Sequence, residues 1–315
     1  MSSPAISVVM PVHNGQEFLD ASIGSIRAQT LRDFEFVIVD DGSKDRTAEI
    51  LQWHAAEDPR IRIIAQTPKG IAAALNRGIQ AASAPLIARM DADDVAKPER
   101  LARQFETLLR HPEAALIGSS YEVIDRASRL QRRVSLPTTP EEIDKTLMQQ
   151  NCIAHPTVLM RRDCVLDVGG YRAAFLHCED YDLWLRLGES HDLLNIDEPL
   201  LSYREHAAQL TWGDTEQRIL SELGARVSAR CRRAGAADPA EGIDRIARRH
   251  LLDFGLGDAE IETYIVARAL DSAREAGRAG NPRAALAAFH LARRQKSLSL
   301  PTMLRFWLAC ARSVF

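Results

Sequence analysis

Three carboxylates follow one apolar run of the chain and could hold a divalent cation. The run is Leu86–Met90, and the acids after it are Asp91, Asp93 and Asp94. In an extended chain, side chains two residues apart point to the same side, so Asp91 and Asp93 can face one ligand. Convergent carboxylates repel each other unless a cation or several donors lie between them, and hard oxygen ligands favour Mg²⁺ or Mn²⁺. Such a cation would hold an anionic group, most simply a diphosphate; the alternative is a solvated loop whose acids bind nothing.

Four short apolar runs, each followed by a segment with helical spacing, must position these acids. The predicted strands are Ile6–Met10, Phe34–Val39, Ile61–Ile64 and Leu86–Met90. The predicted helices are Gln16–Gln29, a run through Ile50, Leu51 and His54, Gly70–Ala82, and a helix begun by Pro98 with an apolar face of Leu101, Phe105, Leu108 and Leu109. Strands that alternate with helices in this way predict a mostly parallel sheet covered on both faces.

The turns after the first, second and fourth strands are rich in polar residues and glycine. They lie at Pro11–Gly15, Asp40–Ser43 and Asp91–Asp94. In open α/β sheets, ligands bind outside the carboxyl ends of the strands. We therefore expect acids that are far apart in sequence to meet in one crevice, which favours a site for a cation and a diphosphate over a chance triplet.

The middle of the chain predicts less regular structure and then one further helix. The expected segments are a strand at Ala115–Ser119, a connection at Leu130–Thr139, a strand-like run at Ala154–Arg161, a turn at Asp167–Tyr171 and a helix within Cys178–Leu187. Glu179 and Asp180 fall in the first turn of that helix, where the helix dipole stabilises negative charge. On the residues alone, this pair is explained by helix capping.

Five motifs, taken together, resemble glycosyltransferase family 2. They are Val8–Asn14, Val39–Asp45, Met90–Asp94, Gly169–Tyr171 and Glu179–Arg186. The likeness covers about residues 5–210 in the order and spacing of the family. It implies the GT-A fold, a Rossmann-like α/β fold with a mostly parallel sheet flanked by helices. It also implies transfer of one sugar from a nucleotide-diphosphate donor to an acceptor hydroxyl, with inversion at the anomeric carbon.

The resemblance also implies roles for residues at the matching positions. The expected nucleotide-sugar contacts are Pro11, Val12, Asp40, Asp41, Asp91 and Ala92. Asp93 resembles the ligand of the Mg²⁺ or Mn²⁺ that bridges the donor phosphates, and Asp91 is a second candidate ligand. His206 resembles a histidine that closes over the phosphates at the metal, or it is a solvated loop histidine.

Asp180 resembles the general base, with Glu179 as its rival, and the sequence does not separate the two. Inverting transfer needs one base on the acceptor side and charge stabilisation on the leaving-group side, so no covalent nucleophile is required. This chemistry makes a catalytic role for Asp180 preferable to capping. The Gln-x-x-Arg-Trp motif that is typical of processive synthases is absent from the sequence, which favours the addition of a single sugar.

The expected donor is a UDP-sugar, because Asp40 suits the imide N–H of uracil, and the expected acceptor is a saccharide or lipid-linked saccharide of a surface glycan. Two alternatives remain. One is a non-catalytic nucleotide- or glycan-binding protein on a transferase scaffold, and the other is a sugar nucleotidyltransferase. The single glycine in Pro11–Gly15 disfavours the latter, and no Gly-x-Gly-x-x-Gly follows a predicted strand, which disfavours an oxidoreductase.

A change in composition near residue 213 predicts a catalytic domain over 1–212 and a helical C-terminal region over 213–315. The expected helices of the C-terminal region are Thr215–Ala234, Ile243–Asp253, Asp258–Ala276 and Pro282–Lys296. An apolar stripe follows at Leu300, Met303, Leu304, Trp307 and Leu308, flanked by Arg305 and Arg312. This stripe suits peripheral contact with an anionic membrane surface, or packing against the catalytic domain or a second subunit.

Composition places few further limits on function. The chain has 315 residues, is 46% hydrophobic and carries a formal net charge of -3, so nucleic acid is not an expected partner. Its five cysteines form no C-x-x-C pair, and neither a signal peptide nor a spanning helix is indicated. We therefore expect a cytoplasmic enzyme, with the inner face of the cell membrane as the place of any peripheral contact.

Overall fold

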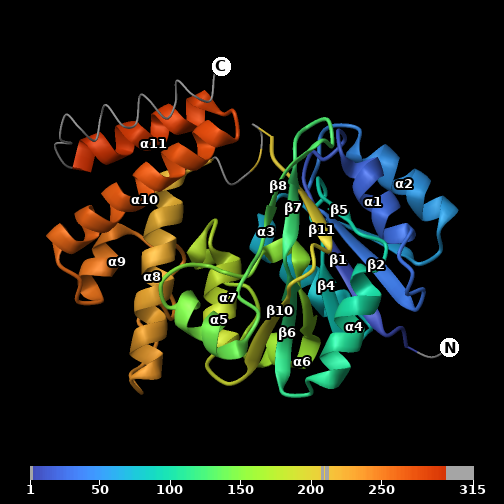
Figure 1. The fold of residues 1–315 in the computed structure, drawn as a ribbon, viewed down its shortest axis with the longest axis horizontal. Coiled ribbons are helices and arrows are strands. Elements are labelled where there is room, and N and C mark those ends of the chain that lie inside the picture. Colours follow the sequence, from blue (N-terminus) through green and yellow to red (C-terminus); the bar gives the residue numbers. More distant parts are fainter. Residues whose placement is uncertain (1–2, 207–208, 210–212, 296–315) are drawn as a thin grey trace. The chain divides into compact units, whose positions relative to one another are not determined.

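A computed structural model describes residues 3–206, 209 and 213–295 (Figure 1). The chain divides into two compact units. The first contains Met1–Ala173 and Leu183–Arg204, and the second contains Ala174–Asp182 and Glu205–Phe315. The domain boundary that we place between residues 212 and 213 stays a prediction, and the two units are described separately.

The first unit is built on a seven-stranded sheet with the order β10-β6-β9-β4-β1-β2-β3. Its strands are β1 (Ile6–Val12), β2 (Phe34–Asp40), β3 (Ile61–Ala65), β4 (Leu86–Arg89), β6 (Ala114–Ser119), β9 (Leu159–Arg161) and β10 (Asp192–Ile196). All neighbouring pairs are parallel except those of β9, which is antiparallel to β4 and β6. The expectation of a mostly parallel sheet is confirmed.

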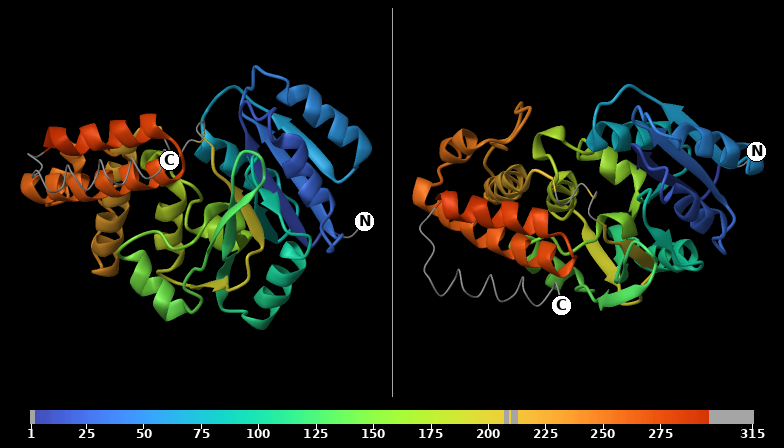
Figure 2. Two further views of the ribbon diagram at one scale, coloured as in Figure 1. Left: turned by 45° about the horizontal axis from the view of Figure 1, so that its top comes forward. Right: turned by 90° about the horizontal axis from the view of Figure 1, so that it is seen from above.

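Helices cover both faces of this sheet, as Figure 2 shows. They include α1 (Leu19–Arg27), α2 (Thr47–Glu57), α3 (Ile71–Ala81) and α4 (Arg100–Arg110). Alternate residues of β1, beginning with Ile6 and Val8, share one core with α1, α2 and α4. On the other face, Val37 and Val39 of β2 pack against α3. Gly78 lets α3 approach closely, because a Cβ at this position would clash with the Val9 side chain.

A second, four-stranded sheet has the order β5-β11-β7-β8. Its strands are β5 (Val95–Ala96), β7 (Tyr121–Ile124), β8 (Leu130–Val134) and β11 (Leu201–Arg204). The prediction that Leu130–Thr139 is only a connection is therefore wrong, since β8 pairs with β7. Four of the five β8 residues are exposed at the sheet edge, so no alternation of apolar and polar residues marks this strand.

Two local predictions for the first unit are wrong in part. Leu109 does not belong to the apolar face of α4, because its side chain is 68% exposed. It lies about 100° around the helix from the buried Leu108. The run Ala154–Arg161 is not one strand: a 3₁₀ turn, η1 (His155–Thr157), precedes β9. Pro156 has no N–H to contribute to a strand ladder, and the strand begins only after it, at Leu159.

The remaining helices of the first part of the chain connect these strands. They are α5 (Pro140–Leu147), α6 (Arg162–Asp167), the 3₁₀ turn η2 (Ala173–Phe175) and α7 (Glu179–Leu187). The helix predicted within Cys178–Leu187 is confirmed as α7. Its residues up to Asp182 are grouped with the second unit, and those from Leu183 with the first.

The second unit is helical beyond residue 213. Its helices are α8 (Thr215–Arg233), α9 (Arg248–Asp253), α10 (Asp258–Arg278) and α11 (Pro282–Gln295). Helices α10 and α11 pack side by side in Figures 1 and 2. The prediction of a helix over Ile243–Asp253 is wrong for its first part, because Ala247 is extended and Ile246 donates its N–H to the main-chain oxygen of Ala174 over 3.0 Å.

The amphipathic helix predicted from Leu300 to Leu308 lies outside the described residues. Within the described part of the chain, every helix is too short or too polar to cross a lipid bilayer.

Candidate functional site

The three acids after β4 lie close together. Side-chain oxygens of Asp91, Asp93 and Asp94 are all within 4.8 Å of one another. Ser22 of α1 fixes the loop by donating its hydroxyl to the main-chain oxygen of Asp91 over 2.6 Å. Asp91 and Asp93 are half-buried and Asp94 is buried. Oδ2 of Asp94 is buried and has no hydrogen-bond partner among the described residues.

The electrostatics of this cluster favour a bound cation. Burial raises the pKa of Asp91; the charge of Asp93 adds to this effect, although Arg89 opposes it. Burial, together with the charges of Asp93 and Asp91, holds the pKa of Asp94 well above its ordinary value. A cation between the three carboxylates would offset their repulsion and favour the ionised forms.

Buried arginines surround the acids, although no motif in the sequence points to them. Arg89 forms an ion pair with Asp91. Arg100 is fully buried and donates to the main-chain oxygen of Arg89 over 2.7 Å. Burial and the charge of Arg89 lower the pKa of Arg100 to about 9. One signal for Arg89 was present in the sequence, since a charged residue inside an apolar strand needs a partner.

A third arginine, Arg204, ends β11 and holds the same loop. Its main-chain N–H donates to Oδ1 of Asp94 and its Nε–H to the main-chain oxygen of Asp93, each over 2.8 Å. The guanidinium also lies 4.7 Å from the centre of the Phe18 ring. It donates to the main-chain oxygen of Asp125 in the β7–β8 turn over 3.1 Å. Arg204 thus connects the acidic loop to the second sheet.

The turns after β1 and β2 also meet, as their positions in the sheet predict. The main-chain N–H of Asp41 donates to the oxygen of Val12 over 2.9 Å. Nδ1 of His13 lies 2.8 Å from the main-chain oxygen of Asp41. Asn14 has a φ of 53° and donates its main-chain N–H to the Ser43 hydroxyl over 2.9 Å. These contacts join the two turns into one rigid edge.

Asp40 and Asp41 are both buried, and their carboxylates have different surroundings. Oδ1 of Asp40 accepts the main-chain N–H of Ser43 over 2.9 Å, which shapes the turn. The Asp41 carboxylate accepts the main-chain N–H groups of Lys69 and Gly70, each over 2.8 Å. Asp41 therefore fixes the start of α3. Its position in the motif did not indicate this role. The contact of Asp41 with the nucleotide stays a prediction.

The predicted base and the predicted closing histidine belong to the second unit. Glu179 is buried, with 6% of its surface exposed, whereas Asp180 is half-buried. Oδ1 of Asp180 lies 2.7 Å from the main-chain N–H of Tyr181. His206 donates its main-chain N–H to Oε1 of Gln209 over 3.3 Å. The catalytic role of Asp180 and the metal role of His206 stay predictions.

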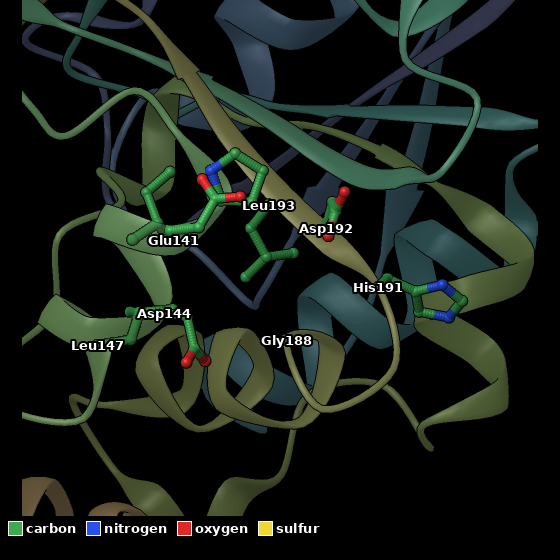
Figure 3. Close-up of a pocket in the computed structure, with 9 residues that line it drawn as sticks. Glu141, Asp144, Leu147, Gly188, His191, Asp192 and Leu193 are labelled. Carbon is green, nitrogen blue, oxygen red and sulfur yellow. The ribbon is translucent and has the colours of Figure 1, made fainter.

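A cavity of about 260 Å³ occurs elsewhere in the first unit, lined by α5 and the segment that leads from α7 into β10 (Figure 3). Its lining residues are Pro140, Glu141, Ile143, Asp144, Leu147, Gly188, His191, Asp192 and Leu193. No residue that the sequence predicts for the site lines this cavity.

Comparison with known sequences identifies the class of protein. The sequence model of Glycosyl transferase family 2 matches residues 7–169. The O-antigen biosynthesis glycosyltransferase WbnJ of Escherichia coli is 36% identical over 205 residues, which cover 64% of this chain and 80% of WbnJ. The E. coli UDP-Glc:alpha-D-GlcNAc-diphosphoundecaprenol beta-1,3-glucosyltransferase WfgD is 30% identical over 200 residues, covering 62% of this chain and 75% of WfgD.

Two solved structures have a similar fold. S. aureus TarS in complex with UDP-GlcNAc aligns with a TM-score of 0.59 at 14% identity, over 93% of each chain. The mannosyltransferase PcManGT of Pyrobaculum calidifontis, in complex with GDP-Man and Mn²⁺, aligns with a TM-score of 0.55 at 16% identity, over 100% of this chain and 82% of that one. The fold is thus the GT-A fold. The chain belongs to glycosyltransferase family 2, and it is a glycosyltransferase.

Proposed function

We propose that this enzyme moves one hexose from a nucleotide-diphosphate sugar to a hydroxyl of a saccharide or lipid-linked saccharide, with inversion at the anomeric carbon and with the assistance of Mg²⁺ or Mn²⁺. The three-aspartate cluster after β4 carries this proposal. Its oxygens lie within 4.8 Å of one another, and one buried oxygen of Asp94 has no hydrogen-bond partner among the described residues. This donor set fits a hard divalent cation.

Asp93 and Asp91 would hold the cation, and His206 would close over the phosphates. Asp93 is half-buried and so can be reached by a ligand, while Arg204 fixes its main chain. Arg89 orients Asp91 through their ion pair. When bound, the cation would act as a Lewis acid on the oxygens of the leaving diphosphate.

Pro11, Val12, Asp40, Asp41 and Ala92 would contact the donor's nucleotide. A UDP-sugar is the favoured donor, because Asp40 suits the uracil imide and because WfgD and the TarS complex are named with uridine nucleotides. The hydrogen bonds between the β1 and β2 turns keep this edge rigid before the donor binds. Because these turns need little further ordering when the donor binds, less conformational entropy is lost on binding.

Asp180 would accept the proton of the attacking acceptor hydroxyl. It is favoured over Glu179 because it is half-buried, whereas Glu179 is only 6% exposed and a base must reach the proton that it removes. The acceptor class is supported by WfgD, which is named for its action on a diphosphoundecaprenol-linked sugar. Peripheral contact with the inner face of the cell membrane would bring the enzyme to such an acceptor.

The test is a transfer assay with UDP-glucose, UDP-GlcNAc or GDP-mannose, Mn²⁺, and a short-chain GlcNAc-diphospholipid as acceptor. We expect a nucleoside diphosphate and a glycosylated lipid as products. NMR of the product should show a β linkage from the α-linked donor. An α-linked product would contradict inversion, and binding of a donor without turnover would contradict the transfer reaction.

A further inference from the structure

The segment that carries the proposed base is part of the helical second unit. Residues Ala174–Asp182 group with Glu205–Phe315, although they are adjacent in sequence to residues of the first unit. We propose that helices α8 and α10 are the platform that positions Asp180, and that Glu222 is the positioning residue at its centre. This inference rests on the role proposed above for Asp180. The matched family sequence ends at residue 169, before either helix begins.

Hydrogen bonds hold the segment before Asp180. The main-chain oxygen of Ala174 accepts the N–H of Ile246 over 3.0 Å. Two residues before Asp180, the Cys178 thiol donates to the main-chain oxygen of Arg218 in α8 over 3.4 Å. These two hydrogen bonds attach the segment before α7 to Ile246 and to helix α8.

A buried polar cluster joins α8 to α10. Glu222 of α8 is only 4% exposed. It accepts the Tyr264 hydroxyl over 2.8 Å and forms an ion pair with Arg268 over 3.0 Å, and both of these partners lie on α10. Nη1 of Arg226 donates to the same Tyr264 hydroxyl over 2.9 Å. A buried network whose polar groups are hydrogen-bonded to one another favours a single packing of the two helices.

Tyr181, the residue after Asp180, is buried, with 1% of its surface exposed. Burial raises the pKa of Tyr181; Arg226 opposes the shift, and the charges of Glu222 and Tyr264 add to it. The mechanical link to Asp180 is the thiol of Cys178, which is bonded to the main chain of α8 one helical turn before Glu222. A shift of α8 would therefore move the start of α7 and, with it, Asp180.

His177 indicates that the segment is held against a local preference. Its φ is 65°, a left-handed conformation that non-glycine residues adopt at a cost in free energy. Such a conformation persists only where the surrounding structure determines it. The hydrogen bonds of Ala174 with Ile246 and of Cys178 with Arg218 provide that surrounding structure.

The test compares Tyr264→Phe and Glu222→Gln with Thr263→Ala, a control on α10 that removes an exposed hydroxyl, which donates to the main-chain oxygen of Ala259 in the same helix. Turnover is measured as UDP release from UDP-glucose with Mn²⁺ and the short-chain GlcNAc-diphospholipid acceptor, and donor affinity as the Kd of UDP with Mn²⁺. We expect the first two variants to lower kcat by roughly tenfold or more, because small misplacements of a catalytic group are costly. Their Kd for UDP and the kcat of the control should match wild type.

A double-mutant cycle separates positioning from general destabilisation. If Glu222 and Tyr264 act through Asp180, then Tyr264→Phe should lower the rate of wild type but not the residual rate of Asp180→Asn. Losses that multiply in the double variant would overturn the inference. So would an unchanged kcat in both Tyr264→Phe and Glu222→Gln.

Amide hydrogen exchange tests the anchoring of this segment without requiring turnover, so it separates this inference from the proposed function. We expect faster exchange of the amides of residues 174–182 in Tyr264→Phe, with no change at residues 91–94. Unchanged exchange at 174–182 would overturn the anchoring whether or not the enzyme turns over. Full turnover by Asp180→Asn would instead contradict the proposed base, and the catalytic part of this inference with it. If Tyr264→Phe does not fold, Glu222→Gln serves for both measurements.

Discussion

Arg204 donates its main-chain N–H to Oδ1 of Asp94 over 2.8 Å, although the two residues are 110 positions apart in sequence. The same residue holds the main-chain oxygen of Asp93 through its Nε–H. The end of β11 thus sets the shape of the acidic loop after β4. It acts together with the Ser22 hydroxyl and the Arg89 ion pair, which both hold Asp91.

Arg204→Gln should weaken the metal-dependent binding of UDP by roughly tenfold, which is a change of about 1.4 kcal/mol. The substitution removes the buried guanidinium that holds Asp93 and leaves the main-chain bond to Asp94. Calorimetric titration of UDP in the presence of Mn²⁺ measures the effect. Arg110→Gln is the control, since Arg110 forms an exposed ion pair with Glu106. Equal affinities for wild type and Arg204→Gln would show that Arg204 does not position the loop.

Asp93→Asn should abolish the dependence of UDP binding on Mn²⁺ while the protein stays folded. The neutral amide keeps the shape of the side chain but loses the charge that a divalent ion requires. The difference in melting temperature with UDP, between Mn²⁺ and chelator, measures this. Glu113→Gln, which alters a half-exposed acid paired with His111, should behave as wild type. A full Mn²⁺ response in Asp93→Asn would remove this residue from the metal site.

Asp180→Asn should lower kcat by roughly 10²–10⁴-fold, the usual contribution of a positioned base. The affinity for UDP with Mn²⁺ should not change, since the base acts on the acceptor. Glu179→Gln should have a much smaller effect on kcat, because Glu179 is buried. Initial rates with UDP-glucose compare the two variants. If Glu179→Gln is the more damaging of the two, the roles are the reverse of those proposed here.

Asp58 should make the stability of the protein depend on pH. The Arg60 guanidinium, 2.7 Å away, lowers the pKa of Asp58 from 3.8, while burial opposes the shift. Because the folded pKa lies below the unfolded value, the stabilisation is complete above pH 3.8 and is lost as the pH falls through the folded pKa.

Asp58→Asn should therefore lower the free energy of unfolding by roughly 1.5–3 kcal/mol at neutral pH, the range for hydrogen bonds to charged groups. The difference from wild type should disappear in acid. Urea unfolding over a series of pH values measures both, and Glu57→Gln is the exposed control at the neighbouring position. A constant difference at all pH values would show that packing, and not ionisation, is responsible.

Much of the fold follows from local sequence patterns. Buried parallel strands such as Phe34–Asp40 are nearly continuous apolar runs, and the acids at their carboxyl ends must lie at one edge of the sheet. The closeness of Asp91 and Asp93 could be predicted in this way, because it depends on a spacing of two residues and a strand end.

Other features depend on contacts between distant residues, which periodicity does not reveal. Strand β8 is an exposed edge strand, so its polar residues carried no signal. The role of Arg204 depends on an acceptor 110 residues away, and the role of Asp41 on the main chain of Lys69 and Gly70. The helix expected from Ile243 begins only at Arg248, because Ile246 is bonded to Ala174.

Binding of a nucleotide through a divalent cation is the property of the acids after β4 on which the proposed function depends. It is tested most directly by thermal-shift measurements on the wild-type protein with UDP, UDP-glucose, UDP-GlcNAc, GDP and GDP-mannose, each with Mn²⁺, with Mg²⁺ and with chelator. A ligand at about 100 times its Kd stabilises the folded state by about 2.7 kcal/mol, which is readily measured. We predict stabilisation by uridine nucleotides that requires Mn²⁺ or Mg²⁺ and is lost with chelator. Equal stabilisation with and without the metal, or none by any nucleotide, would contradict metal-dependent nucleotide binding at these acids.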